Sequence, residues 1–337
     1  MSDGGGLDMA CGGLPALREL AAAIGGDPLL VQGAGGNVSI KTGGIMWIKA
    51  SGTWLADALT SDIMLPLALA GEAVAPHAWC ALRPSIETSM HAALRHAVVL
   101  HVHHVDTIAL AVRPDAAALL AERLAGLRWA FVPYCRPGPS LATAVAALDG
   151  SADVLVLGNH GLVAAADTVA AAKALLTEVT GRLAAPARTP PPGNADVLAA
   201  LVRPHGFRQP ADPSAHGLAT DPASLAIATA GVLYPDHVVF LGPAPMVVDA
   251  HEDVGAALDR WRAGGPTGPS WLIVRGVGVA IAEDLACGGD AMLRCLADVA
   301  ARVPAGAVVA ALPTAEVEAL LDWDAERYRQ QLARAAA

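Results

Sequence analysis

The feature that most constrains this chain is a pair of histidines inside an apolar run, LRHAVVLHVHHVDTIALAV at residues 94–112. Side chains at positions i and i+2 of a strand point to one face, so His101 and His103 would project together. Paired imidazoles suit zinc and similar ions. The other interpretation is a pair of satisfied core histidines, or one exposed face of an edge strand. The pattern predicts half of a metal site, which needs at least a third ligand.

The third ligand is predicted at His160, in the segment GNHG. Glycines on both sides permit tight turns and close backbone approach, which a histidine packed only for its volume would not need. Two histidines from a strand and one from a turn leave a coordination position open, and an open position is typical of catalytic rather than structural metal sites.

An acid precedes this strand, because PSIETSMHAALRHA at 84–97 predicts a helix that begins near Pro84 and contains Glu87. One interpretation of Glu87 is stabilisation by the helix dipole. The other is a general base near the metal, with a pKa raised by partial desolvation. His91 lies one turn further on the same face, and packing or support of the site is a better interpretation for it than metal ligation.

Three segments, GAGGNVS (33–39), KASGT (49–53) and RPSIE, predict a pocket for an anion. They combine glycine-rich backbone, hydroxyl groups, an amide and one ammonium group. None is a Walker A sequence, and GAGGNVS does not open a helix as a dinucleotide-binding fingerprint would. The candidate binding residues are Asn37, Lys49, Ser51, Gly52 and Ser85.

Composition limits the partners. The 337 residues carry a net charge of −10 without a basic cluster, which argues against nucleic acid or an anionic membrane as the main partner. No basic segment followed by an apolar core stands at the N-terminus, and no apolar run is long enough to span a membrane, so we expect a cytoplasmic protein. Five cysteines without a CxxC pair fit reduced, dispersed thiols.

The order of elements predicts two parts. Residues 1–185 contain strands alternating with helices, with helices expected at 14–25, 115–126 and 168–184 and a hairpin turn at Thr42–Gly43–Gly44, so this part reads as a layered α/β domain. Residues 186–217 are rich in Pro and polar residues and read as a linker. Residues 218–337 then form a smaller C-terminal α/β unit with a helix near 287–303.

Two stretches of the chain resemble each other. The segments starting LVLGNHGLVAAAD and LIVRGVGVAIAED both read strand, glycine turn, strand, acidic residue and alanine-rich helix. Aligning Gly161 with Gly278 places His160 on Val277. Duplication and the common βα building plan both explain the match. In either case the second copy lacks the imidazole, so the chemistry is expected in the first half.

Taken together, GGNVS, a strand ending in SGT, PS-x-E, HxH and NHG occur in an order that resembles the class II aldolase/adducin family over residues 15–185. The segments LYPDHVVFLG and LIVRGVGVAIAED further resemble the aldolase portion of bifunctional rhamnulose-1-phosphate aldolase/alcohol dehydrogenase proteins. The dehydrogenase that normally follows is not expected in a chain that stops at Ala337. The resemblance implies a layered αβα domain with a mixed central sheet.

The resemblance also implies functions for residues. His101, His103 and His160 would hold a divalent ion, usually Zn2+, with Mn2+ or Co2+ as alternatives, and Glu87 would be the catalytic acid/base. Asn37, Ser51, Gly52 and Ser85 would occupy phosphate-binding positions, with Lys49 nearby. Where the family often has a second hydroxyl residue, this chain has Ile86. The proton-donor tyrosine of the family would correspond to Tyr134, Tyr234 or Tyr328.

The expected reaction is cleavage of a ketose phosphate to dihydroxyacetone phosphate and an aldehyde by a homo-oligomer. A sugar-phosphate 4-epimerase, a keto-acid-phosphate decarboxylase and a non-enzymatic adducin-like domain are the alternatives implied by the same resemblance.

Overall fold

The computed structural model describes residues 12–69, 82–265, 268–285 and 287–335. The chain divides into two compact units, one formed by positions up to 111 together with 115–184, the other by 112–114 together with 185 onward. Cys11 and Cys80 lie outside the described residues.

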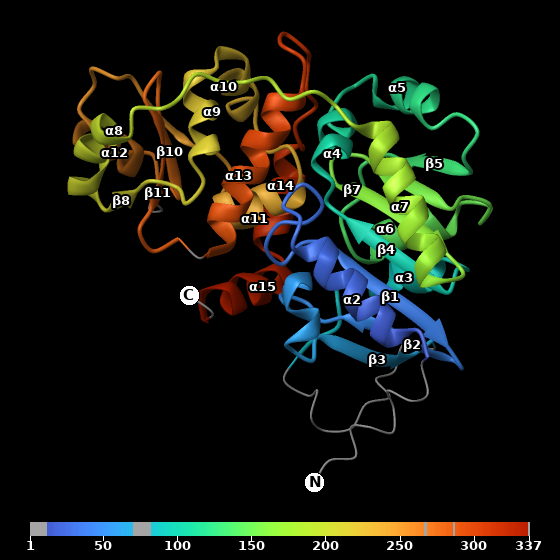
Figure 1. Ribbon diagram of the computed structural model, residues 1–337. Helices are drawn as coiled ribbons and strands as arrows, with labels where there is room; N and C mark the ends of the chain where they lie inside the picture. Colours follow the sequence, from blue (N-terminus) through green and yellow to red (C-terminus); the bar gives the residue numbers. More distant parts are fainter. Residues whose placement is uncertain (1–11, 70–81, 266–267, 286, 336–337) are drawn as a thin grey trace. The chain divides into compact units, whose positions relative to one another are not determined.

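The first unit contains a seven-stranded mixed sheet (Figure 1). Its strands are β1 (Asn37–Thr42), β2 (Ile45–Lys49), β3 (Met64–Ala68), β4 (Val98–Val102), β5 (Trp129–Val132), β6 (Val154–Leu157) and β7 (Gly161–Ala166). They follow the order β3-β2-β1-β4-β7-β6-β5, in which only the β5–β6 pair is parallel. The predicted hairpin turn is confirmed, because Gly43 and Gly44 both have positive φ and join β1 to β2.

Helices cover both faces of this sheet. They are α2 (Leu14–Gly25), η1 (Leu55–Leu59), α3 (Thr88–Ala93), α4 (Val105–Ala111), α5 (Ala116–Arg123), α6 (Pro139–Ala146) and α7 (Val169–Leu183). Val98, Leu100 and Val102 of β4 pack into the core that contains α2, α5 and α7. Val99, on the other face of β4, packs with α3 and α6. The expected αβα layering and mixed sheet are therefore confirmed, and strand alternation decides which β4 residues face α3.

The second unit has its own four-stranded sheet, in the order β8-β11-β10-β9. Its strands are β8 (Phe207–Arg208), β9 (Met246–Val248), β10 (Trp271–Val274) and β11 (Gly278–Ala282). Its helices are α8 (Ala195–Val202), η3 (Arg203–His205), η4 (Pro213–His216), α9 (Gly217–Thr220), α10 (Pro222–Ala228), α11 (Pro235–Leu241), α12 (Val254–Ala263), α13 (Cys287–Arg302), α14 (Thr314–Leu321) and α15 (Asp324–Ala335). A separate apolar core lies between α8, α12 and this sheet.

The predicted linker at 186–217 differs from the structure, in which this stretch belongs to the second unit. It contains helix α8, capped by the Asn194 side chain, and strand β8, which pairs with β11. Arg188 fixes its Pro-rich beginning by donating hydrogen bonds to Ser224 and to the carbonyl oxygen of Ala300. The prolines of this segment therefore belong to an ordered part of the second unit and not to a flexible linker.

The expected helix over 84–97 is also shorter in the structure, where α3 has six residues. Among the described residues, no helix combines the length and the apolar character that crossing a membrane requires.

Candidate metal centre

Three buried histidines of the first unit converge, as the sequence predicted. His101, His103 and His160 have exposed fractions of 0%, 6% and 4%, and their ring centroids lie 4.9–5.1 Å apart. One ligand nitrogen from each ring lies within 4.8 Å of the others. His101 belongs to β4 and follows Val99 on the face that packs against α3 and α6. The three rings could hold one metal ion.

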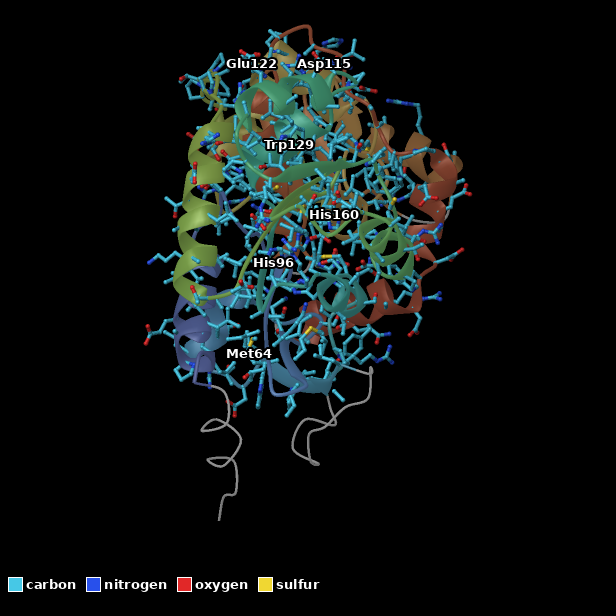
Figure 2. The ribbon with its side chains drawn as sticks, turned by 90° about the vertical axis from the view of Figure 1, so that its right-hand side faces the viewer. Met64, His96, Asp115, Glu122, Trp129 and His160 are labelled. Atoms are coloured by element: carbon cyan, nitrogen blue, oxygen red, sulfur yellow. The ribbon has the colours of Figure 1, made fainter. Side chains whose placement is uncertain are left out.

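The turn between β6 and β7 positions His160 (Figure 2). Asn159 is the one described non-glycine residue with a positive φ, 51°, which lets three residues connect Leu157 to Gly161. A Cβ atom on Gly161 would lie 2.4 Å from the carbonyl oxygen of Val102, so β7 approaches β4 this closely only with glycine there. The predicted close approach is confirmed. Asn159 is a residue that sequence reasoning missed, although Asn is common in this conformation.

Hydrogen bonding fixes one imidazole in the tautomer that suits a metal ligand. His101 Nδ1 lies 3.1 Å from the carbonyl oxygen of Leu162, which can only accept, so Nδ1 carries the hydrogen. In a neutral ring the lone pair is then on Nε2, which lies 3.3 Å from Glu87 Oε2. A lone pair facing a carboxylate oxygen is repulsive unless a proton or a cation lies between them. The donor set therefore fits a divalent cation, with Nε2 as the ligand atom and a backbone carbonyl holding the ring.

Glu87 lies against these histidines rather than capping its helix. It occupies the N-cap position of α3, but its side chain makes no capping hydrogen bond. Its two carboxylate oxygens lie 3.3 Å from His101 Nε2 and 3.4 Å from His160 Nε2, and the residue is 4% exposed. The helix-dipole interpretation does not explain this placement, whereas proximity to a cationic centre does.

The expected raised pKa of Glu87 is wrong. Burial acts to raise the pKa of its carboxyl group, but the positive charge of His101, His160 and His103 and the hydrogen bond from Asn37 lower it to about 2. Desolvation alone predicts a raised value, whereas three imidazoles surround this carboxylate. Glu87 is therefore ionised at neutral pH.

Asn37 and Ser85 contact Glu87 directly. The Asn37 amide nitrogen donates to Glu87 Oε2 at 2.7 Å and to Ser85 Oγ at 3.2 Å. Ser85 Oγ also accepts from the Glu87 backbone N–H at 3.3 Å, which leaves the hydroxyl hydrogen of Ser85 to donate elsewhere. Ser85 precedes the short α3 helix. The backbone N–H of Glu87, at the start of that helix, donates to Ser85 Oγ and is therefore not available to bind an anion.

The KASGT and RPSIE segments also meet, because Ala50 bridges Pro84 and the Ser51 N–H donates to the Arg83 carbonyl oxygen at 2.8 Å. Gly52 adopts a positive φ of 77°. This contact brings Ser51 and Gly52 to the chain segment that contains Ser85, as the anion-pocket prediction requires.

Lys49 has a different environment from the one expected. Its side chain is 2% exposed, and Nζ donates to the carbonyl oxygens of Ala34 at 3.0 Å and Thr53 at 2.6 Å. The ammonium group thus ties the glycine-rich loop to the SGT loop. Lys49 would therefore affect the predicted anion pocket by holding these two loops together, and its buried ammonium group is directed to carbonyl oxygens.

The candidate tyrosines differ in burial, because Tyr134 and Tyr328 are half-buried whereas Tyr234 is buried. Tyr234 belongs to the second unit, is 2% exposed, donates to Cys295 Sγ at 3.4 Å, and has a pKa raised well above its usual value, first of all by burial. Tyr134 belongs to the first unit, and its backbone nitrogen lies 3.0 Å from the position of a Cβ on Gly158, in the His160 turn.

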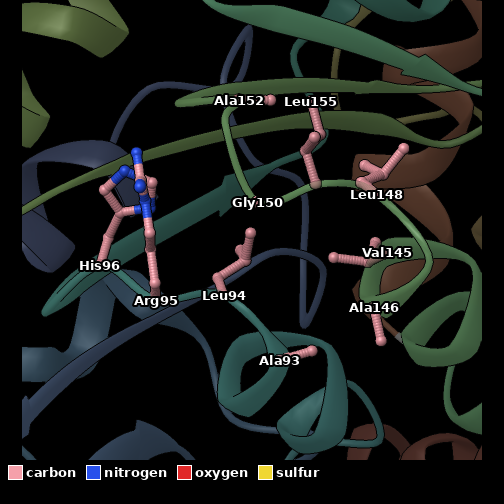
Figure 3. Close-up of a pocket in the computed structure, with 10 residues that line it drawn as sticks. All are labelled: Ala93, Leu94, Arg95, His96, Val145, Ala146, Leu148, Gly150, Ala152 and Leu155. Carbon is pink, nitrogen blue, oxygen red and sulfur yellow. The ribbon is translucent and has the colours of Figure 1, made fainter.

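A small cavity of about 70 Å³ lies in the same unit, between the segment 93–96 that precedes β4, the end of α6 and the start of β6 (Figure 3). Arg95 and His96 form one side, and most of the remaining lining is apolar. His96 is paired with Asp153 at 2.8 Å. None of the predicted site residues lines this cavity, so it is separate from the histidine cluster.

A family model matches the first unit. Residues 19–184 fit the family model for the Class II Aldolase and Adducin N-terminal domain. The uncharacterized oxidoreductase YuxG of Bacillus subtilis (strain 168) is 33% identical over 174 residues, which cover 43% of this chain and 25% of YuxG. The chain therefore spans about a quarter of the length of that curated relative.

Solved structures match about half of the chain. The N-terminal class II aldolase domain of a conserved protein from Thermoplasma acidophilum is 24% identical with a TM-score of 0.42, covering 49% of this chain and 89% of that one. L-fuculose-1-phosphate aldolase from Thermus thermophilus is 20% identical with a TM-score of 0.40, covering 50% of this chain and 90% of that one.

Proposed function

Since the first unit, over residues 19–184, belongs to the class II aldolase and adducin family, we propose that the protein is a divalent-metal-dependent aldolase. It would cleave a ketose phosphate into dihydroxyacetone phosphate and an aldehyde. The observation that supports this best is the cluster of three buried imidazoles around the ionised carboxylate of Glu87.

His101, His103 and His160 would hold the ion, most simply Zn2+, because imidazole nitrogen suits it. When bound, the ion would supply Lewis acidity for the negative charge that develops on the substrate oxygens during carbon–carbon cleavage. Mn2+ and Co2+ are the alternatives, and a metal titration separates them.

Glu87 would transfer the proton at carbon. Its carboxylate is ionised at neutral pH, so in the condensation direction Glu87 would act as a base and take a proton from the carbon next to the ketone. In the cleavage direction the carboxylate would take the proton of the substrate hydroxyl group as the carbon–carbon bond breaks, and would then give that proton to the carbon. Its two oxygens face the imidazole cluster, so the proton would be exchanged beside the centre of positive charge.

Ser51, Gly52 and Ser85 would bind the substrate phosphate. The two segments that contain them are joined by the Ala50–Pro84 bridge. Ser85 retains a hydroxyl hydrogen to donate, and the left-handed backbone at Gly52 is typical of anion-binding turns. Lys49 would act on the anion through its charge and through the loop shape that it maintains.

The test is a metal assay of the purified full chain combined with a screen of ketose 1-phosphates, following release of dihydroxyacetone phosphate. Release that stops with chelator and returns with Zn2+ supports the proposal. A single isomeric product would indicate an epimerase, and carbon dioxide would indicate a decarboxylase. Turnover that chelator leaves unchanged would contradict the metal mechanism. The likeness of the C-terminal unit to the bifunctional rhamnulose type, the homo-oligomeric state and the cytoplasmic location stay predictions.

A further inference from the structure

The fold holds the three histidines of the metal centre in different ways. His101 lies within β4 and is paired with residues of both β1 and β7. His160 belongs to the turn that joins the paired strands β6 and β7. His103 follows Val102, the last residue of β4, and is not part of the strand ladder. Contacts from outside the sheet must therefore fix the backbone at His103.

The segment 27–32, between α2 and β1, supplies such contacts. The carbonyl oxygen of Leu29 accepts a hydrogen bond from the Val105 N–H at 2.9 Å. The side chain of Gln32 donates from Nε2 to the carbonyl oxygen of His103 at 3.3 Å. These two contacts lie on either side of His104, where the chain passes from β4 into α4. One segment thus holds the backbone at the point where a metal ligand leaves the sheet.

The Gln32 amide is itself held in one orientation. Its Nε2 also donates to the carbonyl oxygen of Pro28 at 2.7 Å. Because carbonyl oxygens only accept, the nitrogen end of the amide must face both of them. Asp27 fixes the turn below, since its Oδ1 accepts from the Leu29 N–H at 2.9 Å and its carbonyl oxygen accepts from the Val31 N–H at 3.0 Å. The orientation of the amide therefore does not depend on a bound metal.

The oxygen end of the same amide is unfavourable for folding. Gln32 is 3% exposed, and its Oε1 is buried without a hydrogen-bond partner among the described residues. A buried acceptor that is left unsatisfied destabilises a fold. An apolar side chain of similar length would avoid this cost, so folding alone does not explain an amide at this position. The hydrogen bond to His103 does explain it.

We propose that Gln32 is a positioning residue for the metal ligand His103. Its amide holds the carbonyl oxygen of His103, and thereby keeps the imidazole directed at the ion. This inference rests on the proposed function, because it requires a metal ion at the three histidines. Metal-ligating histidines are commonly held through the ring, as His101 is by the carbonyl oxygen of Leu162. At His103 the hold acts through the backbone.

The test replaces Gln32 with methionine, which has a similar length but no N–H. Three quantities are measured on the full chain: the dissociation constant for Zn2+, the visible absorption of bound Co2+, which reports ligand geometry, and the urea midpoint of the metal-free protein. For Gln32→Met we expect Zn2+ affinity to fall by about 10–100-fold and the Co2+ spectrum to shift. The metal-free midpoint should stay at that of the parent, because removal of the unsatisfied Oε1 offsets the loss of two hydrogen bonds.

Gln209→Met is the matched control. Gln209 belongs to the second unit, and its Nε2 donates to the carbonyl oxygen of Ala195 at 2.8 Å. This variant also removes an amide that donates to a backbone carbonyl group, but away from the histidines. It should leave both the Zn2+ affinity and the Co2+ spectrum unchanged.

Parent-like Zn2+ affinity and a parent-like Co2+ spectrum in Gln32→Met would overturn the inference. A loss of affinity with an unshifted spectrum and a lowered midpoint would also contradict it, because Gln32 would then stabilise the fold without placing His103. Gln32→Asn is the second variant should Gln32→Met fail to fold. Its amide is one methylene shorter and cannot reach both carbonyl oxygens, so the spectrum should shift in the same direction, and parent-like values would contradict the proposal.

The parent protein separates this inference from the proposed function. A parent that binds Zn2+ but releases no dihydroxyacetone phosphate would refute the aldolase reaction alone, and the metal measurements would still decide the role of Gln32. A parent that binds no divalent ion would refute the metal centre and this inference with it.

Discussion

The two units repeat one topology but only one contains the imidazoles. In the first, β6 pairs in parallel with β5 and antiparallel with β7, and β7 pairs antiparallel with β4. In the second, β10 pairs in parallel with β9 and antiparallel with β11, and β11 pairs antiparallel with β8. A long helix follows each hairpin, α7 in one case and α13 in the other. The similarity found in the sequence is therefore confirmed at the level of topology.

The agreement extends to the turns. Leu157 pairs with Gly161 and Val274 pairs with Gly278, so three residues form each turn. The middle residue has positive φ in both, 51° at Asn159 and 71° at Gly276. The hairpin architecture thus needs a left-handed middle residue but no histidine.

The two turns differ in chemistry at their last residue. It is His160 in the first unit and Val277 in the second. Strand β8, the counterpart of β4, consists of Phe207 and Arg208, and Arg208 pairs with Asp290 at 2.6 Å. The same strand pairing is therefore present with and without metal-ligand side chains. Histidines at 101, 103 and 160 are thus better explained by chemistry than by folding.

The largest expected effect comes from removing the turn imidazole. His160→Ala should weaken metal affinity by more than about a hundredfold, beyond the usual cost of losing a supporting contact, and reduce turnover to background. Val277→Ala is the matched control and should leave bound metal unchanged. Metal content after dialysis is the measurement. Equal metal content in the two variants would remove the functional distinction between the turns.

Glu87→Gln should come next, because it removes the ionised carboxylate but keeps an acceptor for Asn37. We expect turnover to fall by about 10²–10⁴-fold, the usual size of an acid–base contribution, with metal still bound. Asp196→Asn is the control, since Asp196 lies in the first turn of α8, the helix that precedes β8. Steady-state kinetics on both variants decides; similar turnover in the two would refute a catalytic carboxylate on α3.

A third prediction concerns acid stability and His237 of α11. Burial lowers the pKa of His237 from 6.5 to about 4, so its stabilising contribution is complete above pH 6.5 and is lost as pH falls towards 4. The loss amounts to about 3 kcal/mol. His237→Asn keeps an acceptor for the Leu233 N–H, and the free energy of unfolding of this variant should fall less steeply as the pH is lowered. Urea unfolding between pH 4 and pH 7 tests this, and an equally steep decline in the variant would contradict it.

The histidine cluster could be predicted from the sequence because strand alternation places His101 beside His103 and because glycines flank His160 in its turn. Prediction from the sequence failed for side chains whose environment is set by residues distant in the chain. The pKa of Glu87 depends on imidazoles up to 73 positions away, and Lys49 is directed to the Ala34 carbonyl by a tertiary fold that spacing does not reveal.

The segment 186–217 was misjudged for a different reason. Its prolines read as a free connection, but Pro190 packs against Gly217, where a Cβ would lie 2.6 Å from the proline ring. Such packing depends on a tertiary contact between residues 27 positions apart, which proline content alone does not reveal. A helix signal was nonetheless present, because Asn194 stands directly before the apolar residues of α8 and caps it.

The smallest expected effect concerns the middle residues of the two turns. Asn159→Ala and Gly276→Ala each place alanine in the left-handed region, so each should lower the free energy of unfolding by about 1–2 kcal/mol. At Gly276 no atom lies within 4 Å of the added Cβ, so backbone strain is the whole cost there. Glycine and asparagine both tolerate the left-handed region better than alanine, so the free energies of unfolding of Asn159→Gly and Gly276→Asn should stay closer to that of the parent. Urea unfolding provides the four values, and metal binding of Asn159→Gly should remain, because the turn conformation persists. If alanine is tolerated at one turn and not at the other, the two hairpins differ in backbone constraint as well as in chemistry.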